Sequence, residues 1–353
     1  MAEYNALMGL FPGLRVLSTY SEFEPCYAEY QARYPQYSER IARFDGTLPD
    51  SGGFVYVNFL NNAIQFLPAI EAQQVPFLVT LYPGGGFGLD EETSDSKLRR
   101  VLDSPLLRGV ITTQPVTQSY IEARLPARLR STLIRGVVVN PLYFATQSMA
   151  PRAYFGHGKD TFDVCFVAEK YMPLGANKGY PEFIAAANAL YGASPRLRWH
   201  VIGNFSASDC DVAALGTRIR FWGRLATAEL RDALRGMDAI VSPNQPFMLH
   251  AGNFDGFPTG CCVEASLCGV AMIVTDPLNQ NPGYVDGLDI LLIPPDPKAI
   301  VARISDLLSH PYRSAAIGQR GQRLSQRLYA PELQVGQRHA LLKTLAAREG
   351  CRI

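Results

Sequence analysis

The sequence contains no continuous run of about 18 apolar residues, the length that a membrane-crossing helix requires. This holds although 47% of its 353 residues are hydrophobic. Its 33 basic and 32 acidic side chains leave a net charge of +1, which gives no general attraction to nucleic acid. The amino-terminal residues also lack the basic-then-apolar layout of a secretory signal. We therefore expect a cytoplasmic protein that binds no nucleic acid.

Cysteine and histidine are too scattered to indicate a metal site. The seven cysteines include no pair of CxxC motifs, and His157, His200 and His250 lie far apart in the sequence. Structural zinc sites have closely spaced ligands, so no bound metal is predicted. The odd number of cysteines favours free thiols in a reducing compartment. The chain also lacks the G-x-S-x-G and Walker motifs, which argues against an α/β-hydrolase or a P-loop ATPase.

Short apolar runs alternate with helix-like segments along the whole chain. The runs are continuous, as expected for parallel strands that are buried on both faces. The predicted strands are 15–20, 54–59, 77–82, 110–113, 133–139, 162–168, 197–203, 219–222, 239–242, 271–275 and 290–293. The predicted helices are 28–44, 63–73, 94–102, 117–125, 180–190, 226–234, 262–268, 297–308 and 331–348. This alternation predicts an α/β protein with two doubly wound, Rossmann-like domains.

A polar segment between Asn140 and Asp160 separates the two halves. It contains Pro141, Pro151 and several glycines and shows little hydrophobic periodicity. We expect a first domain over residues 1–145 and a second over residues 161–330. The last stretch, residues 331–353, holds a helix that either completes the second domain or crosses back to the first.

The segment from Asp255 to Asp276 carries the clearest chemistry. It reads DGFPTGCCVEASLCGVAMIVTD, a Gly/Pro-rich turn followed by an apolar helix and a β-branched strand. Free backbone N–H groups and the dipole at the start of such a helix favour an anion. Glu264 lies within the helix, where a carboxylate is costly unless it is hydrogen-bonded. A phosphate at the turn and a sugar hydroxyl at Glu264 would satisfy both features, whereas a surface turn and a capped core glutamate are the alternative.

Four blocks of the second half, in this order, resemble the nucleotide-sugar domain of GT-B glycosyltransferases, closest to family 4. They are 163–179 (DVCFVAEKYMPLGANKG), 197–203 (LRWHVIG), 219–243 and 255–276. In the first half the resemblance is limited to strand 77–82 with its PGGGF loop and to residues 110–113 and 134–141. The resemblance implies two domains that face each other across a cleft, with transfer of a sugar from a nucleotide diphosphate with retention. It also implies that no metal or other cofactor is bound.

The resemblance further implies which residues of the second half hold the donor. Lys178, at a helix start, would bind a phosphate, and Lys170 would replace an arginine that the family carries after its first strand of this domain. The turn after Trp222 and the end of the preceding strand would line the base pocket, through Gly203, Gly223, Arg224 and Leu225. Backbone amides near the diphosphate would come from Gly256, Phe257, Pro258 and Thr259.

Two acids are implied to act on the donor. Asp255 would contact sugar hydroxyls and stabilise positive charge at the anomeric carbon, and Glu264 would hold the ribose hydroxyls. Eight residues separate them here, one more than in the family, and a bulge in the turn would absorb the extra residue. Lys178, Asp255 and Glu264 are therefore the predicted catalytic residues.

The first half offers candidates for binding the sugar or the acceptor. Gly84, Gly85 and Gly86 follow a predicted strand and would let a ligand approach the backbone, although a flexible loop is the alternative. Tyr82 stands where the family often has histidine. Asn61 would hydrogen-bond a hydroxyl or cap a helix. His250, which precedes Asp255, either lines the donor site or lies in solvent.

These observations predict a glycosyltransferase that uses a UDP- or GDP-type sugar donor. The acceptor would be a glycan or a lipid-linked sugar, in the assembly of a bacterial surface polysaccharide or glycolipid. A non-catalytic relative that binds nucleotide sugars and a nucleotide-sugar epimerase of related architecture are the alternatives. A cluster of arginines and leucines forms either a patch for peripheral contact with the inner membrane face or a solvated basic face. It comprises Arg124, Arg128, Arg130 and Arg135 together with Leu125, Leu129 and Leu133. The sequence indicates no oligomeric state.

Overall fold

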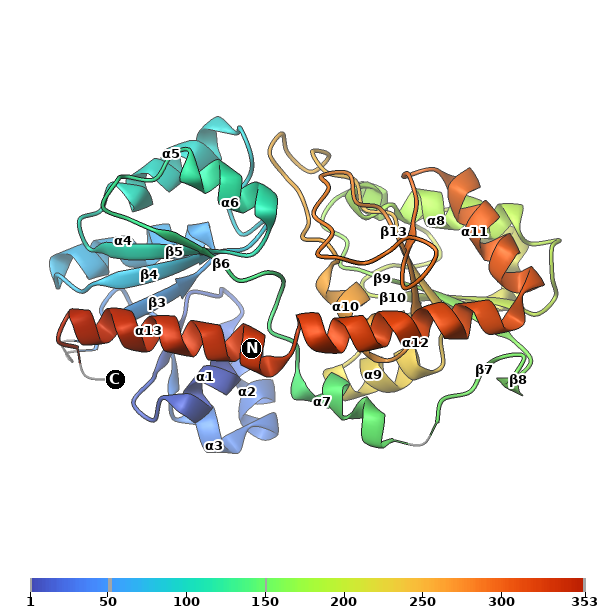
Figure 1. Ribbon diagram of the computed structural model, residues 1–353, viewed down its shortest axis with the longest axis horizontal. Coiled ribbons are helices and arrows are strands. Elements are labelled where there is room, and N and C mark those ends of the chain that lie inside the picture. Colours follow the sequence, from blue (N-terminus) through green and yellow to red (C-terminus); the bar gives the residue numbers. More distant parts are fainter. Residues whose placement is uncertain (1, 50–52, 150, 352–353) are drawn as a thin grey trace. The chain divides into compact units, whose positions relative to one another are not determined.

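The computed structural model describes residues 2–49, 53–149 and 151–351. The chain divides into two compact units, the first formed by residues 1–138 and 331–353 and the second by residues 139–330 (Figure 1). The carboxyl-terminal helix thus belongs to the first unit. The segment 139–160, which contains Pro141 and Pro151, belongs to the second unit. No described helix is long and apolar enough to cross a membrane.

The first unit is built on a four-stranded parallel sheet in the order β3-β4-β5-β6. The strands are β3 (Val55–Asn58), β4 (Phe77–Leu81), β5 (Leu107–Thr112) and β6 (Ser131–Leu133). A separate parallel pair comprises β1 (Val16–Ser18) and β2 (Ile41–Arg43). The helices are α1 (Ala2–Leu10), α2 (Phe23–Arg33), α3 (Pro35–Ser38), α4 (Leu60–Ala72), α5 (Glu92–Leu102), α6 (Pro115–Glu122) and α13 (Gln337–Arg348), the last preceded by a π-helical turn (Glu332–Gly336).

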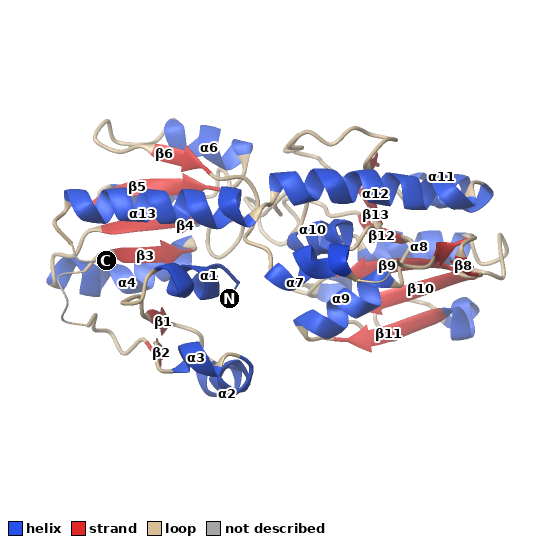
Figure 2. Ribbon diagram, turned by 60° about the horizontal axis from the view of Figure 1, so that its bottom comes forward, coloured by secondary structure: helices blue, strands red, loops and turns tan. Residues whose placement is uncertain are grey.

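The two ends of the chain pack on the same sheet. Leu7 of α1 and Leu342 of α13 share one apolar cluster with Leu78 of β4 and Ile111 of β5. All four side chains are buried, which removes their apolar surface from water and stabilises the unit. Figure 2 shows α13 lying along the strands of this sheet.

The predicted helix over residues 28–44 is wrong in its second half. Helix α2 ends at Arg33, Pro35 opens the short helix α3, and residues 41–43 form strand β2. Tyr34 has φ −134°, an extended value. The reason is that proline disfavours the helical conformation of the residue before it. The apolar pattern of this segment therefore covers two short helices and a strand.

A buried charged network joins the two chain ends beneath the first sheet. Arg338 of α13 is completely buried and forms an ion pair with Glu3 of α1, with 3.4 Å between Nε and Oε1. The hydroxyl of Tyr82 donates to Glu3 Oε2 at 2.6 Å and accepts from Arg338 Nη2 at 3.1 Å. Tyr56 also donates to Glu3. Burial raises the pKa of both tyrosines, so their hydroxyls remain protonated donors.

The arginines of the predicted basic face in the first unit make contacts with other residues of the same unit. Arg124 lies over the Tyr120 ring at 3.5 Å and pairs with Asp90 at 3.4 Å. Arg128 donates to the carbonyls of Leu102 and Ser104, and Arg130 to those of Ala127 and Leu129. The arginines therefore cap chain turns, and nothing in these contacts supports a membrane surface.

The second unit contains a six-stranded parallel sheet in the order β11-β10-β9-β12-β13-β14. Its strands are β9 (Phe162–Val167), β10 (Leu197–Ile202), β11 (Ile219–Gly223), β12 (Ala239–Ser242), β13 (Ala271–Val274) and β14 (Leu291–Leu292), and β7 (Tyr154–Phe155) pairs with β8 (Gly158–Lys159). The helices are α7 (Pro141–Phe144), α8 (Tyr180–Ala189), α9 (Thr227–Arg235), α10 (Gly260–Leu267), α11 (Pro297–Ser309) and α12 (Pro311–Leu328), with 3₁₀ turns at 145–148, 173–178 and 213–218.

The strand order of this sheet reverses between β9 and β12. From β9 the chain adds β10 and β11 on one side, and it then returns to add β12, β13 and β14 on the other. In open α/β sheets of this kind a crevice forms at the carboxyl ends of the strands on either side of the reversal. The fold therefore locates the candidate site at the ends of β9, β10 and β12.

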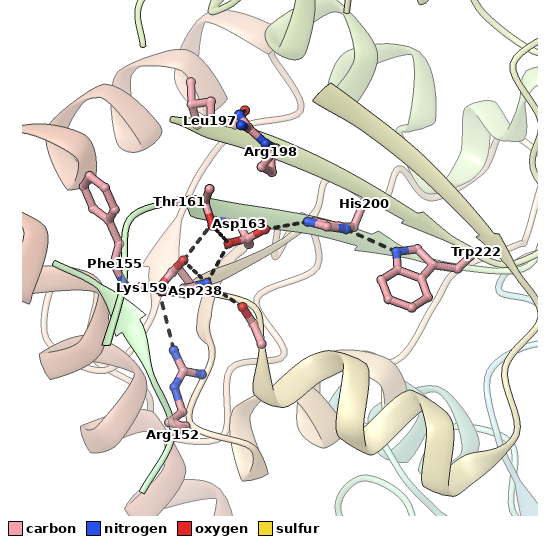
Figure 3. A network of polar contacts seen from close by, with 11 residues as sticks. Arg152, Phe155, Lys159, Thr161, Asp163, Leu197, Arg198, His200, Trp222 and Asp238 are labelled. Carbon is pink, nitrogen blue, oxygen red and sulfur yellow. Dashed lines mark hydrogen bonds and ion pairs between the residues drawn. The ribbon is translucent and has the colours of Figure 1, made fainter. Parts of the chain in front are cut away.

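A polar network occupies the beginning of β9 and of β12 (Figure 3). Asp238, which is completely buried, accepts from the backbone N–H groups of Phe155 (2.8 Å) and Asp163 (2.9 Å). Asp163 contacts His200 Nε2 at 2.7 Å, and Trp222 donates to His200 Nδ1 at 3.2 Å. Nδ1 is thus an acceptor and Nε2 carries the proton. The network fixes the strand starts and engages both ring nitrogens of His200.

Candidate functional site

A hollow of about 440 Å³ opens at the reversal of strand order in the second unit. Its lining includes the carboxyl ends of three neighbouring strands, through Val167 and Ala168 at the end of β9, Ile202 and Gly203 at the end of β10, and Ser242 at the end of β12. Helix α10 begins on the same lining with Gly260 and Cys261. Ligand pockets commonly measure some 300–1,000 Å³, so the hollow is large enough for a nucleotide.

Two of the predicted catalytic side chains meet in this hollow. Lys178 Nζ lies 2.6 Å from Asp255 Oδ1. Lys178 ends the 3₁₀ turn after β9 and is largely buried, while Asp255 lies in the loop between β12 and α10. The two opposite charges neutralise each other. An anion that enters the hollow therefore meets a cation that already has an acidic partner.

A second ion pair lies on the lining of the same hollow. Arg224, in the turn after β11, donates from Nε to Glu169 Oε1 at 2.9 Å and from Nη2 to Glu169 Oε2 at 2.9 Å. The bidentate geometry orients the guanidinium. Leu225, the next residue, also lines the hollow. The predicted turn residues Arg224 and Leu225 are therefore brought to the site.

The two glycines predicted to line the base pocket, Gly203 and Gly223, have different surroundings. Gly203 lines the hollow with φ +128°, and a Cβ there would lie 1.8 Å from the carbonyl oxygen of Ala168. Only glycine fits this approach between the ends of β9 and β10. Gly223 ends β11 and has open space where its Cβ would be, but it is not among the lining residues.

Lys170 does not line the hollow. Its Nζ pairs with Asp209 Oδ1 at 2.7 Å, and its backbone N–H donates to Asn204 at 2.6 Å. The loop after β9 directs this lysine toward the Phe205 ring, 5.9 Å away, rather than toward Lys178. The predicted replacement of the family arginine by Lys170 therefore lacks support from its position. Among the described residues, the cations on the lining are Lys178 and Arg224.

The turn before α10 is shared between the large hollow and a smaller one of about 30 Å³. Gly256, Phe257 and Pro258 line only the smaller hollow, whereas Asp255 and Thr259 line both. Thr259 is the residue before α10, and its hydroxyl contacts the Cys261 sulfur at 3.2 Å. Of the four residues predicted to offer amides, only Thr259 is thus placed on the large hollow.

Glu264 lies on α10 one turn beyond the lining residues and is not itself part of the lining. The hydroxyl of Tyr143, a completely buried residue of α7, is hydrogen-bonded to its carboxyl group. Burial raises the pKa of Glu264 to about 8, and the Tyr143 hydrogen bond acts in the opposite direction. Glu264 is therefore mostly protonated at neutral pH in the unliganded protein.

This carboxyl group should make stability depend on pH. Between about pH 5 and 8 the folded chain retains a proton that an unfolded glutamate has released, so unfolding free energy falls as pH rises. In the wild type, this fall in unfolding free energy should be on the order of 3 kcal/mol across that window, and we expect it to be absent in Glu264→Gln. Denaturant titrations of both proteins from pH 5 to 9 measure it. Tyr143→Phe, which removes the lowering hydrogen bond, should extend the fall to higher pH. A constant difference between wild type and Glu264→Gln would contradict the prediction.

The predicted residues of the first unit gather at the carboxyl ends of β3 and β4. Gly84, Gly85 and Gly86 all have positive φ, and the carbonyl oxygen of Gly85 accepts from the backbone N–H of Asn61 at 2.8 Å. The loop is thus a hydrogen-bonded turn rather than a loose connector. Asn61 does not cap α4, because Phe59 holds the N-cap position and Asn61 lies inside the helix. The hydroxyl of Tyr82 is engaged by Glu3 and Arg338 and is directed into the unit.

His250 lines neither hollow. It lies in the loop between β12 and α10, where its carbonyl oxygen accepts from Asn253 at 3.0 Å. Several lining residues were not predicted from the sequence, namely Glu169, Tyr171, Ser242, Asn244, Gly260 and Cys261. Their position after β9 and β12 was the available indication, since the residues at strand ends line such crevices. Tyr143 had no comparable indication.

Comparisons with known proteins agree with this geometry. Residues 162–310 match the family model described as glycosyl transferases group 1. No curated protein sequence matches the chain. The chain is similar to the structure of HepE from Anabaena in complex with UDP-glucose, with a TM-score of 0.66 and 14% identity over 95% of this chain and 99% of that one.

Two further structures show the same fold. Sucrose-phosphate synthase from Thermosynechococcus elongatus has a TM-score of 0.61 and 18% identity, covering 93% of this chain and 80% of that one. A mutant of S. aureus TarM, in complex with fondaparinux, α-GlcNAc-glycerol and UDP, has a TM-score of 0.56 and 12% identity over 82% of this chain and 53% of that one.

Fold and family model together define the class of protein. With two α/β units, each on a parallel sheet, and a crevice at the reversal of the second sheet, the protein has the fold of the GT-B glycosyltransferases. More particularly, residues 162–310, which include all six strands of the second sheet up to β14, are similar to the group 1 glycosyl transferases.

Proposed function

We propose that the protein transfers a sugar from a nucleotide-diphosphate donor to a glycan or lipid-linked acceptor, with retention of anomeric configuration and without a bound metal. The observation that carries this proposal is the Lys178–Asp255 pair in a nucleotide-sized hollow at the carboxyl ends of β9, β10 and β12. A cation and a carboxylate 2.6 Å apart provide opposite charges for the leaving diphosphate and for the anomeric carbon.

The charged residues of the hollow would then bind different parts of the donor. Lys178 and Arg224 would bind the diphosphate, together with the N–H groups at the start of α10. As the diphosphate takes up Lys178, Asp255 is freed to accept hydrogen bonds from the donor sugar. Its carboxylate would also stabilise the positive charge that develops when the glycosidic bond breaks.

Glu264 would hold the ribose hydroxyls after exchanging its present partner. Its carboxyl group lies one turn along α10 from the lining and is hydrogen-bonded to Tyr143. A ribose hydroxyl can replace the Tyr143 hydroxyl as donor, because the Tyr143 hydroxyl has a second acceptor in the Thr227 carbonyl at 3.5 Å. Donor binding would thus move one hydrogen bond from α7 to the nucleotide.

A uracil base is the best-supported choice for the donor. The structures of HepE and TarM that resemble this chain contain UDP or UDP-glucose. A transfer reaction on a surface polysaccharide or glycolipid is the process that we infer from the family resemblance of the sequence. The alternatives are a nucleotide-sugar epimerase, which would yield an altered sugar still attached to the nucleotide, and a non-catalytic binding protein, which would yield no product.

Nucleotide binding is the direct test of the donor site. We expect UDP, among UDP, GDP, ADP and CDP, to raise the melting temperature of the full chain most, because a ligand present at 100 times its Kd adds about 2.7 kcal/mol of stability. A fluorescence melt with millimolar nucleotide measures the shift. Release of UDP from UDP-glucose that increases with added glycoside supports transfer, whereas an altered sugar still attached to UDP indicates an epimerase. Binding without turnover indicates a non-catalytic relative, and no shift with any nucleotide contradicts the proposal.

A further inference from the structure

The backbone of Phe59 in the first unit has an unusual conformation. Its φ is +73° and its ψ is +144°, a region that is nearly exclusive to glycine. The residue follows β3 and precedes α4, and hydrogen bonds hold it on both sides. Its N–H donates to the Thr80 carbonyl at 2.9 Å, and its carbonyl accepts from the N–H of Ala63 at 3.1 Å. Such strain persists where the surrounding structure enforces it, and it is concentrated at functional sites.

The strained backbone sets the place of a large aromatic ring. The Phe59 ring packs against Tyr82 with 5.3 Å between ring centroids, and the ring lies directly over Gly85. A Cβ at Gly85 would come within 2.4 Å of a ring carbon, so the loop must carry glycine there. Even so, 37% of Phe59 remains exposed. The fold therefore keeps a partly exposed phenyl ring at the carboxyl edge of β3 and β4 in a costly conformation.

Polar groups lie next to this ring. The Asn61 side chain is packed against Gly86, where a Cβ would lie 2.0 Å from Oδ1. Lys97 donates to that oxygen at 2.9 Å. This bond orients the amide, and Asn61 Nδ2 has no hydrogen-bond partner among the described residues. The turn therefore offers an aromatic ring together with an oriented N–H donor.

An apolar ring with hydrogen-bond donors beside it suits a sugar. A pyranose has C–H groups on its faces, which carry partial positive charge and are attracted to the negative face of an aromatic ring. Its hydroxyl groups lie at the rim, where they can accept from N–H donors. A purely apolar partner would leave the Asn61 amide and the Lys97 ammonium without new partners, which disfavours it.

We propose that Phe59 is the platform on which the sugar ring of the acceptor stacks, and that Asn61 Nδ2 donates to one of its hydroxyls. The assignment rests on the proposed glycosyl transfer and adds to it the acceptor subsite. Phe59 selects an acceptor whose terminal residue is a pyranose with an exposed C–H face. The two ion pairs of the second unit are assigned to the donor, so the two subsites can be tested separately.

The first test compares Phe59→Leu with Phe59→Trp in the full chain. UDP release from UDP-glucose is followed over a range of methyl α- and β-glycosides of glucose, galactose and N-acetylglucosamine. We expect Phe59→Leu to raise the acceptor KM about tenfold and to leave the donor KM unchanged. Phe59→Trp, which keeps an aromatic ring, should retain the acceptor KM of the wild type. Tyr34→Ala removes a partly buried tyrosine at the far end of α2 and is the matched control. An unchanged acceptor KM in Phe59→Leu would overturn the platform.

The second test separates the platform from a structural role of the ring. Glycine adopts the Phe59 backbone angles freely, whereas alanine keeps the strain. We expect Phe59→Gly to melt about 4 °C above Phe59→Ala, while both variants lose acceptor affinity equally. A lower melting temperature for Phe59→Gly would contradict the strain. A wild-type protein that binds UDP but none of the glycosides would overturn the inference alone, whereas one that binds no nucleotide would contradict the proposed function itself.

Discussion

Replacing Lys178 by alanine should lower kcat/KM for sugar transfer by about 10²- to 10³-fold, the effect of removing one preorganised charge from a transition state. In the proposed donor site, the variant loses the cation that would face the leaving diphosphate. It also leaves Asp255, now 2.6 Å from Nζ, as an unpaired negative group in the hollow. Both changes act on phosphate charge, so UDP affinity should fall much more than uridine affinity. Titration calorimetry with UDP and with uridine measures the two losses.

The chain provides a closely matched control for this variant. Lys170 also belongs to the segment between β9 and α8 and also forms an ion pair with an aspartate, at 2.7 Å from Asp209, but it does not line the hollow. Lys170→Ala should therefore leave transfer and UDP affinity within about twofold of wild type, as for a surface ion pair. Equal losses of UDP and uridine affinity in Lys178→Ala would indicate a damaged fold. A loss in Lys170→Ala as large as that in Lys178→Ala would contradict our placement of the donor.

The elements of the second unit were largely predictable from the sequence. The predicted bounds of β9, β10, β12 and β13 agree with the observed bounds to within one residue, because each strand carries a run of mainly apolar or buried residues. The residues after these runs, Lys178 and Asp255 among them, then had to lie at one edge of the sheet. Local pattern and global topology agree here, and this agreement makes the position of the hollow predictable from the sequence.

Side-chain partners distant in sequence were not predictable. Tyr143 and Glu264 are hydrogen-bonded although the chain between them includes most of the second unit. Glu169 and Arg224 meet because β9 and β11 flank β10, an order that no local pattern specifies. The position of Lys170 away from the lining was unpredictable for the same reason, since its partner Asp209 lies after β10. Hydrophobic periodicity locates elements and gives no information on which polar groups pair.

In the first unit, too, the partners of polar side chains were not predictable from the sequence. Tyr82 follows a buried strand next to three glycines, so the sequence favoured a ligand contact. The structure instead directs its hydroxyl to Glu3 and Arg338, residues from opposite ends of the chain. Neither helix α1 nor the burial of Arg338 was foreseen, because a charged residue is normally expected at the surface. The strained Phe59 was likewise invisible, since backbone angles of this kind are set by tertiary contacts.

The buried pair that joins the chain ends leads to the largest expected loss of stability. Arg338→Met should lower the unfolding free energy of the first unit by about 3–5 kcal/mol, because Glu3 then retains a buried charge without its cation. The remaining donors to Glu3 are the hydroxyls of Tyr56 and Tyr82, which satisfy its oxygens but carry no charge. Urea titration of the full chain, followed by a probe in each unit, measures the loss, since two units need not unfold in one transition.

Two further variants determine whether the charge itself is responsible. Arg348→Met changes an exposed arginine of the same helix and should cost less than about 0.5 kcal/mol. Combining Arg338→Met with Glu3→Gln removes both charges at once. The double variant should recover much of the lost stability, because no buried charge is then left without its partner. If the double variant is as unstable as Arg338→Met alone, the arginine stabilises the unit by packing and by its bond to the Gln334 carbonyl (2.8 Å) rather than by neutralising Glu3. That result would contradict the role of the ion pair in holding α13 to the first unit.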